Sequence, residues 1–215
     1  MAKVTAPLLS LGARGTIGKA QTYSVWKGIP YVRQRVVPAN PKSAGQVATR
    51  GTFSWCHDAY KLGGSQFQDP WKLYVKGQPM GPGNAFGQAN IPVLRSQTNL
   101  AHLIFTKAAK GGVSLAAIAL TAGAGQITAN LTLPPMPSGW TLTGAVVMWI
   151  KDQSPAVETE SPQIFSHALT TPFTSYVITG LTASQEYWVG AYPIMTNAAG
   201  ETVYGASLKD HATPT

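Results

Sequence analysis

The pattern of apolar residues changes near Gly111 and Gly112, and this change limits the chain to a fold with two dissimilar parts. Before these glycines, apolar residues recur at three- and four-residue spacings over long stretches, which predicts amphipathic helices. After them, short apolar runs alternate with turn residues about every eight to twelve positions, which is typical of a β-sandwich. We therefore expect an α+β protein with one domain over residues 1–112 and a second over residues 113–215.

The chain is expected to begin with a β-hairpin. Over residues 12–37 apolar and polar residues alternate on both sides of Trp26, Lys27 and Gly28, which predicts a turn at these three residues. Gly15, Thr16, Ile17, Gly18, Lys19 and Ala20 resemble a phosphate-binding loop, but the leading glycine and the final hydroxyl of that motif are absent. We interpret these glycines as turn formers of the hairpin.

Three short helices should follow the hairpin. Their expected starts carry a capping side chain, proline or both, and their expected ends carry glycines or basic residues. The predicted helices run from Asn40 and Pro41 to Gly63 and Gly64, from Asp69 and Pro70 past Tyr74, and from near Asn84, with a break at Pro92, to Lys107 and Lys110.

Seven strands are predicted beyond the two glycines. The apolar runs cover residues 114–120, 127–133, 142–150, 164–165, 175–178, 187–194 and 202–208. Seven strands in about a hundred residues fit one immunoglobulin-like domain.

The last part of this pattern resembles a fibronectin type III module. The resemblance rests on a Leu before a tyrosine corner, an alternating strand, a Gly-containing turn and a final strand of small residues: Leu181, Tyr187, Val189, Ala191, Gly200 and Ser207. The tryptophan that such modules carry on the second strand is missing, and Leu131 or Leu133 stands in its place. The resemblance implies an antiparallel sandwich that serves in interaction rather than catalysis.

Catalytic, cofactor and metal residues are not expected. Cys56, His57 and Asp58 are consecutive, so on a helix their side chains point about 100° apart and form no catalytic relay. The remaining histidines, His102, His167 and His211, are not spaced as metal ligands. Glu158 and Glu160 lie in one loop, and we interpret them as solvated acids rather than as a calcium site. Cys56 is the single cysteine, which excludes an internal disulfide, and no apolar stretch is long enough for membrane insertion.

The charges divide as unequally as the apolar pattern. Residues 1–110 contain fourteen Lys or Arg and two acids, whereas residues 111–215 contain two Lys and six acids. Bases interleaved with aromatic residues can bind nucleic acid through phosphates and stacking. Because the bases are spread along the chain instead of clustered, we favour docking on an acidic protein and keep nucleic acid as the alternative.

The first half is similar to a group of small proteins encoded by tailed bacteriophages and prophages. The similarity covers residues 12–92 and rests on spaced residues: the hairpin, Asn40 and Pro41, Gln46, Arg50, Phe53, Trp71, Asn84, Ala85, Phe86 and Ala89 to Pro92. It implies a virion structural protein, made in the host bacterial cytoplasm and located at the tail, the head–tail junction or the capsid. Its partners would be other virion proteins, with a host surface glycan or receptor for the sandwich.

The hairpin itself is the expected interface. Its apolar residues are too many for a two-stranded ribbon to shelter, and an isolated hairpin is marginal in water. We expect Trp26, Tyr31, Arg33 and Arg35 to contact a partner chain, which predicts a homo-oligomer or a tight complex with another virion protein.

Overall fold

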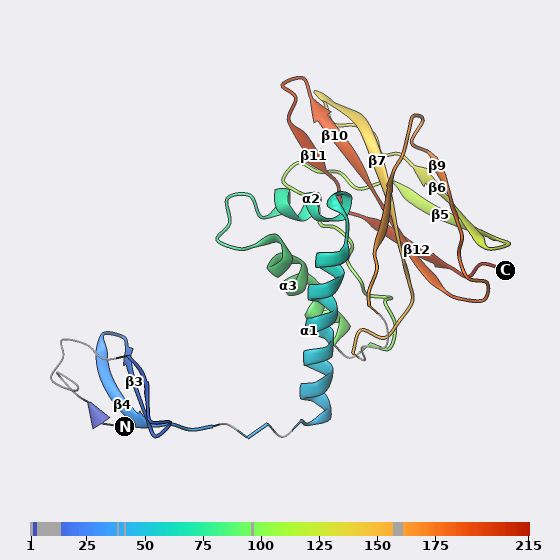
Figure 1. Cartoon of the computed structure of the whole chain (residues 1–215). Helices are drawn as coiled ribbons and strands as arrows, with labels where there is room; N and C mark the ends of the chain where they lie inside the picture. The colour runs from blue at the N-terminus through green and yellow to red at the C-terminus, as the bar shows by residue number, and fades with distance from the viewer. Residues whose placement is uncertain (1, 4–13, 38, 41, 96, 157–160) are drawn as a thin grey trace. The chain divides into compact units, whose positions relative to one another are not determined.

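The chain folds as two units, Met1–Lys42 and Ser43–Thr215. The computed structural model describes residues 2–3, 14–37, 39–40, 42–95, 97–156 and 161–215 (Figure 1). Within these ranges the first unit contains four strands, and the second contains three helices and eight strands. The expected α+β class is therefore confirmed.

The first unit is a four-stranded antiparallel sheet. Its strands are β1 (Ala2–Lys3), β2 (Gly15–Ile17), β3 (Gln21–Trp26) and β4 (Ile29–Gln34), in the order β1-β4-β3-β2. Lys27 and Gly28 join β3 to β4 with φ of 48° and 78°, which is the left-handed geometry that suits the twist of a two-residue hairpin. The predicted turn is thus confirmed, and Gly18, with φ of 57°, lies in the turn between β2 and β3.

The three helices of the second unit are α1 (Ala44–Leu62), α2 (Ser65–Tyr74) and α3 (Pro82–Leu94). The predicted stop at Gly63 is confirmed, but α1 begins after Ser43, so the cap expected at Asn40 is wrong. Pro41, the other half of that signal, lies outside the described residues.

Pro70 lies inside α2 instead of starting it, so the start predicted at Asp69 is wrong. Proline has no N–H, and its place in a helix leaves the carbonyl four residues earlier without its donor. That carbonyl belongs to Gln66, and it accepts a hydrogen bond from the hydroxyl of Tyr192 on a strand of the sandwich. The helix continues through the proline because a tertiary contact supplies the missing donor.

Residues 97–116 form turns and coil, so the predicted helix end near Lys107 and Lys110 is wrong. Leu100, Leu103 and Phe105 of this coil are fully buried. The side chain of Asn90 on α3 donates to the carbonyl of Ile104 at 3.1 Å and accepts from its N–H at 2.7 Å. Side chains from other elements therefore satisfy the backbone of this segment, and it can be buried without becoming a helix.

Two antiparallel sheets form the expected immunoglobulin-like sandwich. The first sheet has the order β5-β6-β9, and the second has the order β8-β7-β10 continued by β11 and β12, which both pair with β10. The strands are β5 (Ala117–Gly123), β6 (Gln126–Thr132), β7 (Trp140–Lys151), β8 (Phe165–Ala168), β9 (Ser175–Thr179), β10 (Tyr187–Asn197), β11 (Thr202–Tyr204) and β12 (Leu208–Ala212). Each predicted apolar run contributes a strand, and the last run is divided between two.

The tyrosine corner and the substitute for tryptophan are both present. Tyr187 begins β10, and its hydroxyl accepts the N–H of Thr182 at 3.2 Å. Leu131 is buried in the core between the sheets. This part of the chain is a fibronectin type III-like β-sandwich.

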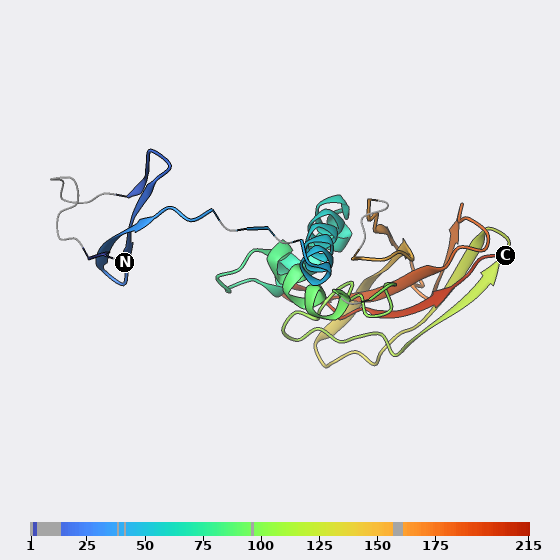
Figure 2. The same cartoon turned by 90° about the horizontal axis from the view of Figure 1, so that it is seen from below.

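The sheet that contains β7 and β10 is covered on both faces. Side chains alternate along β7, so that Ala145 and Val147 pack between the two sheets, whereas Val146 and Met148 pack against the helices. Figures 1 and 2 show the three helices grouped beside the strands of the same unit. The division expected at Gly111 and Gly112 therefore differs from the one observed at Lys42, because helices and sandwich share one core.

Candidate interaction surface

The residues predicted for the interface come together on the N-terminal sheet. In the β3–β4 pairing Trp26 lies opposite Ile29, and Tyr31 and Arg33 follow at every second position of β4, so all four side chains belong to one face. Arg35 comes two residues after Arg33, just beyond the strand, and its N–H donates to the carbonyl of Ala20 at 2.7 Å. The structure thus places Trp26, Tyr31 and Arg33 on one face of the sheet, and the contact of these residues and Arg35 with a partner stays a prediction.

This sheet does not build a core of its own. None of the residues of the first unit whose burial is described is buried, and Trp26 remains 65% exposed. Ile29 is exposed on the face of Trp26, and Ile17 and Val25 are exposed on the other face. A small sheet with apolar side chains open on both faces needs another surface to shelter them.

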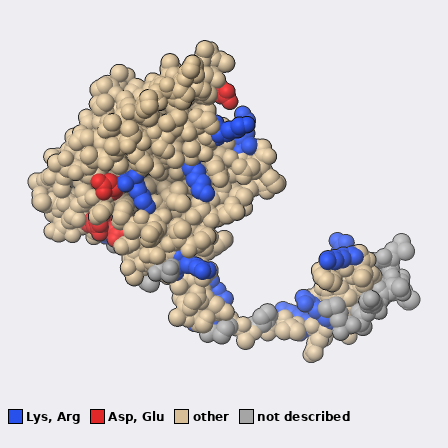
Figure 3. Space-filling model, turned by 180° about the vertical axis from the view of Figure 1, so that it is seen from behind, with Lys and Arg blue, Asp and Glu red and all other residues tan. Residues whose placement is uncertain are grey.

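The same unit carries only positive charge. Residues 1–42 contain seven Lys or Arg and no acid, and all eight acids of the chain lie in residues 43–215. In Figure 3 the N-terminal unit shows blue atoms of Lys and Arg and no red atoms of Asp or Glu. Lys27 places Nζ 5.1 Å from the ring centroid of Trp26. The sheet is therefore a cationic surface with exposed aromatic and aliphatic side chains.

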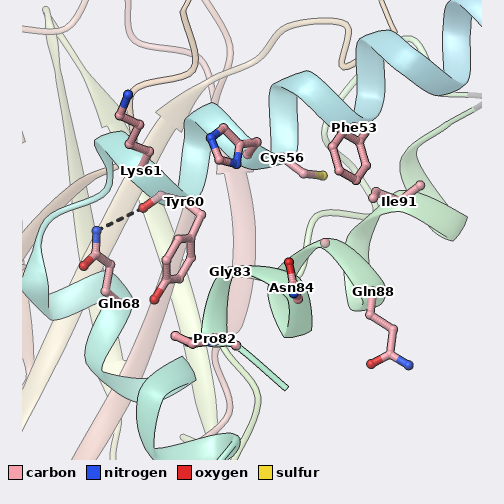
Figure 4. A pocket seen from close by; sticks show the side chains of 13 residues that line it. Phe53, Cys56, Tyr60, Lys61, Gln68, Pro82, Gly83, Asn84, Gln88 and Ile91 are labelled. Atoms are coloured by element: carbon pink, nitrogen blue, oxygen red, sulfur yellow. Dashed lines mark hydrogen bonds between the residues drawn. The ribbon is translucent and has the colours of Figure 1, made fainter. Parts of the chain in front are cut away.

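A pocket between α1 and α3 is a second feature of interest. It has a volume of about 680 Å³, and Phe53, Cys56 and Tyr60 of α1 line it from one side (Figure 4). Gly83 and Gly87 of α3 line it from the other side, and a Cβ atom on Gly83 would lie 3.1 Å from the ring of Tyr60. The absence of a side chain at Gly83 lets α3 approach Tyr60 of α1, and the pocket lies beside this contact.

This pocket was not predicted from the sequence. Two features of the sequence point to it: the glycines of α3 lie four residues apart, and Phe53 is an aromatic residue outside the apolar face of the first predicted helix. Glycines four residues apart lie on one helix face, and their missing side chains allow another element to approach that face closely.

The pocket does not assemble a nucleophilic centre. Cys56 is buried, as expected, and burial raises the pKa of its thiol to about 12. The thiol stays protonated near neutral pH, and the thiolate is the reactive form. His57 is exposed and points from a neighbouring helix position, so it does not pair with Cys56 as a base.

In the described part of the chain, no group of three or more His, Cys, Asp or Glu side chains could hold a metal ion. Glu158 and Glu160, which the sequence offered as loop acids, lie outside the described residues. No helix of the described part has the length and apolar character needed to cross a membrane.

Comparisons with known proteins concern the sandwich. The fibronectin type III domain of the human collagen α1(XX) chain is similar to 50% of this chain over 89% of its own length, at 14% identity and a TM-score of 0.37. A crystal structure of such a domain from human collagen XX covers 46% of this chain and 88% of its own, at 20% identity and a TM-score of 0.32. A redesigned β-sandwich protein covers 47% and 88%, at 15% identity and a TM-score of 0.35. No protein-family model and no curated protein matches the sequence.

Proposed function

We propose that this chain is a non-enzymatic structural protein that docks through its N-terminal sheet. The observation that carries the proposal is an N-terminal unit with seven bases and no acid, in which none of the side chains whose burial is described is buried. Docking would shelter Trp26, Ile29 and Tyr31, and it would place Arg33 against carboxylates that fix register and orientation. The second unit has a complete core and is the body that the sheet anchors.

The setting that we propose is the virion of a tailed bacteriophage. This setting is supported by the similarity of residues 12–92 to small phage proteins, which rests on the hairpin and on spaced residues between Asn40 and Pro92. In this setting the N-terminal sheet docks on the tail, the head–tail junction or the capsid, and the sandwich is exposed for decoration or adhesion. The partners are other virion proteins and further copies of this chain.

In a homo-oligomer, the counterpart of the N-terminal sheet lies on the second unit of another copy. Two N-terminal sheets repel one another because both carry only positive charge. Glu186 and Asp210 lie near each other on the second unit, since His211 is 3.5 Å from one carboxylate and 3.7 Å from the other. A contact of this kind is head-to-tail and generates a ring or a filament instead of a two-fold dimer.

Sedimentation velocity of the full chain tests the proposal. We expect concentration-dependent association of the wild type, and loss of association in the double variant Tyr31→Ala, Arg33→Ala with the second unit still folded. A matched control is Phe53→Ala, Lys61→Ala, which also removes one aromatic and one basic side chain, from exposed positions of α1. A wild type that remains monomeric at high concentration, or a variant that assembles at wild-type strength, contradicts the proposal.

Nucleic-acid binding is the alternative, and the position of Trp26, Tyr31 and Arg33 on one face favours it, because bases stack on aromatic rings beside cations. Protein docking accounts for more of the surface, since aliphatic residues such as Ile17 and Val25 are exposed as well. A gel shift with single-stranded DNA at increasing salt separates the two. Stoichiometric DNA binding that persists at high salt would support the alternative, because non-specific phosphate contacts weaken steeply with salt.

A further inference from the structure

Four rings form a continuous row at one edge of the sandwich, where β8 and β9 lie. Trp149 contacts Phe165 at 5.7 Å between ring centroids and Tyr176 at 6.2 Å. His167 stacks on Tyr176 at 4.2 Å. The strand pairing sets Trp149 opposite Phe165, and His167 follows two residues later on the same face of β8. Two sheets therefore contribute to a single aromatic row.

The end of this row at Phe165 is open to solvent. The ring planes of Phe165 and Trp149 differ by 19°, so Trp149 covers one face of the Phe165 ring. Phe165 nevertheless remains 49% exposed, which leaves its other face available. An aromatic ring held by a second ring, with its free face in water, is a rigid platform that loses little conformational freedom when a ligand stacks on it.

A small hollow adjoins this platform. Its volume is about 170 Å³, and Lys151, Gln153, Gln163 and Tyr187 line it together with Phe165. The strand pairings place Lys151 opposite Tyr187 and Trp149 opposite Phe165, so the hollow opens on the same face of the sheet as the platform. Apart from Lys151, the lining described here is uncharged.

One residue that lines this hollow has a buried side-chain donor without a partner in the described protein. The Nε2 atom of Gln153 is buried and makes no hydrogen bond. Buried amide donors in folded proteins are nearly always paired, with protein, ordered water or a ligand. The amide of Gln163, on an exposed residue of the same lining, adds further donors and an acceptor.

We propose that this edge of the sandwich binds a pyranose sugar. The sugar's C–H face would stack on the free face of Phe165, because an aromatic face is electron-rich and attracts polarised C–H groups. Its hydroxyls would exchange hydrogen bonds with the amide of Gln163, which is exposed, and one hydroxyl would accept from Gln153 Nε2 after that amide turns toward the hollow. An apolar ligand would leave the Gln153 amide unpaired. This site lies in the second unit and does not depend on the docking role proposed for the N-terminal sheet.

The test uses the full chain and a panel of methyl pyranosides: glucoside, galactoside, N-acetylglucosaminide and glucuronide. Saturation-transfer NMR should show transfer to the ring protons of at least one sugar, with millimolar affinity. Phe165→Ala should weaken that affinity by about tenfold or more, a loss of about 1.4 kcal/mol. Gln163→Ala should weaken it by a smaller factor. Both positions are exposed, so the fold is retained.

Phe53→Ala is the control, because Phe53 is an exposed aromatic residue of α1 outside the hollow. It should bind the same sugar with unchanged affinity. The proposal is overturned if none of the four sugars binds, or if Phe165→Ala binds as the wild type does. Self-association that Phe165→Ala abolishes, without any sugar signal, would assign the ring to a protein contact and also overturn it.

Discussion

Lys209 secures the coil between the helices and the sandwich. Its Nζ donates to the carbonyls of Ala101 and Leu103, both at 2.6 Å, and lies 5.4 Å from the ring centroid of Trp188. Burial lowers the pKa of Lys209 to about 8. The side chain is therefore charged at neutral pH but gives up its proton far more easily than an exposed lysine.

This lowered pKa predicts a pH dependence of stability. Between about pH 8 and the ordinary lysine pKa of about 10.4, the unfolded chain binds more protons at Lys209 than the folded chain. The free energy of unfolding should therefore rise with pH in this window, relative to a Lys209→Met variant. Urea denaturation of both proteins from neutral pH to about pH 9.5 measures the difference. Burial raises the pKa of Cys56, so this residue makes the free energy of unfolding fall with pH, but its contribution is the same in both proteins and cancels in their difference. A wild-type free energy of unfolding that falls with pH relative to Lys209→Met contradicts the prediction.

A hydrogen bond between the Tyr192 hydroxyl of β10 and the Gln66 carbonyl joins β10 to α2, and the proline in α2 makes this bond necessary. Pro70 deprives the Gln66 carbonyl of its helical donor, and the Tyr192 hydroxyl replaces it. Burial raises the pKa of Tyr192, so the hydroxyl keeps its proton and remains a donor.

A double-mutant cycle tests this dependence. Tyr192→Phe should lower the free energy of unfolding by about 1–3 kcal/mol, because it leaves the half-buried carbonyl of Gln66 unpaired. In a Pro70→Ala background the restored N–H can bond to Gln66, so the same change should cost about 1 kcal/mol less. Denaturant unfolding of the four proteins gives the coupling; equal costs in both backgrounds would show that the proline and the tyrosine act independently.

Elements with local signals were predictable, and elements held by distant partners were not. The Lys27 and Gly28 turn, the end of α1 at Gly63 and the strands of the sandwich follow from residues close in sequence. The coil over residues 97–116 contains apolar residues at helical spacing, yet its carbonyls are satisfied by Lys209, about a hundred residues later. For the candidate interface, alternation along β4 is enough to place Tyr31 and Arg33 on one face, whereas Trp26, which was expected in the turn, joins them through the register of the β3–β4 pairing.

The second unit is held together by the sheet that both of its cores share. Without the helices, residues 113–215 would expose the outer face of this sheet, including Val146, Met148, Trp188 and Tyr192. We therefore expect residues 43–215 to unfold cooperatively, and residues 113–215 to aggregate or bind hydrophobic dyes. Circular dichroism and light scattering of the two fragments measure this. A monomeric, cooperative β fold of residues 113–215 would restore the boundary predicted at Gly111 and Gly112.

Hydrogen exchange measures directly whether a partner chain completes the N-terminal sheet. Amide exchange of the full chain should be followed at low and high protein concentration, with the Tyr31→Ala, Arg33→Ala variant beside it. We predict that β3 and β4 exchange fast when dilute and become protected as the concentration rises, while the core of the second unit stays unchanged. The variant should show no such gain. Protection of β3 and β4 that is independent of concentration would show that the sheet is stable alone, and would contradict the account.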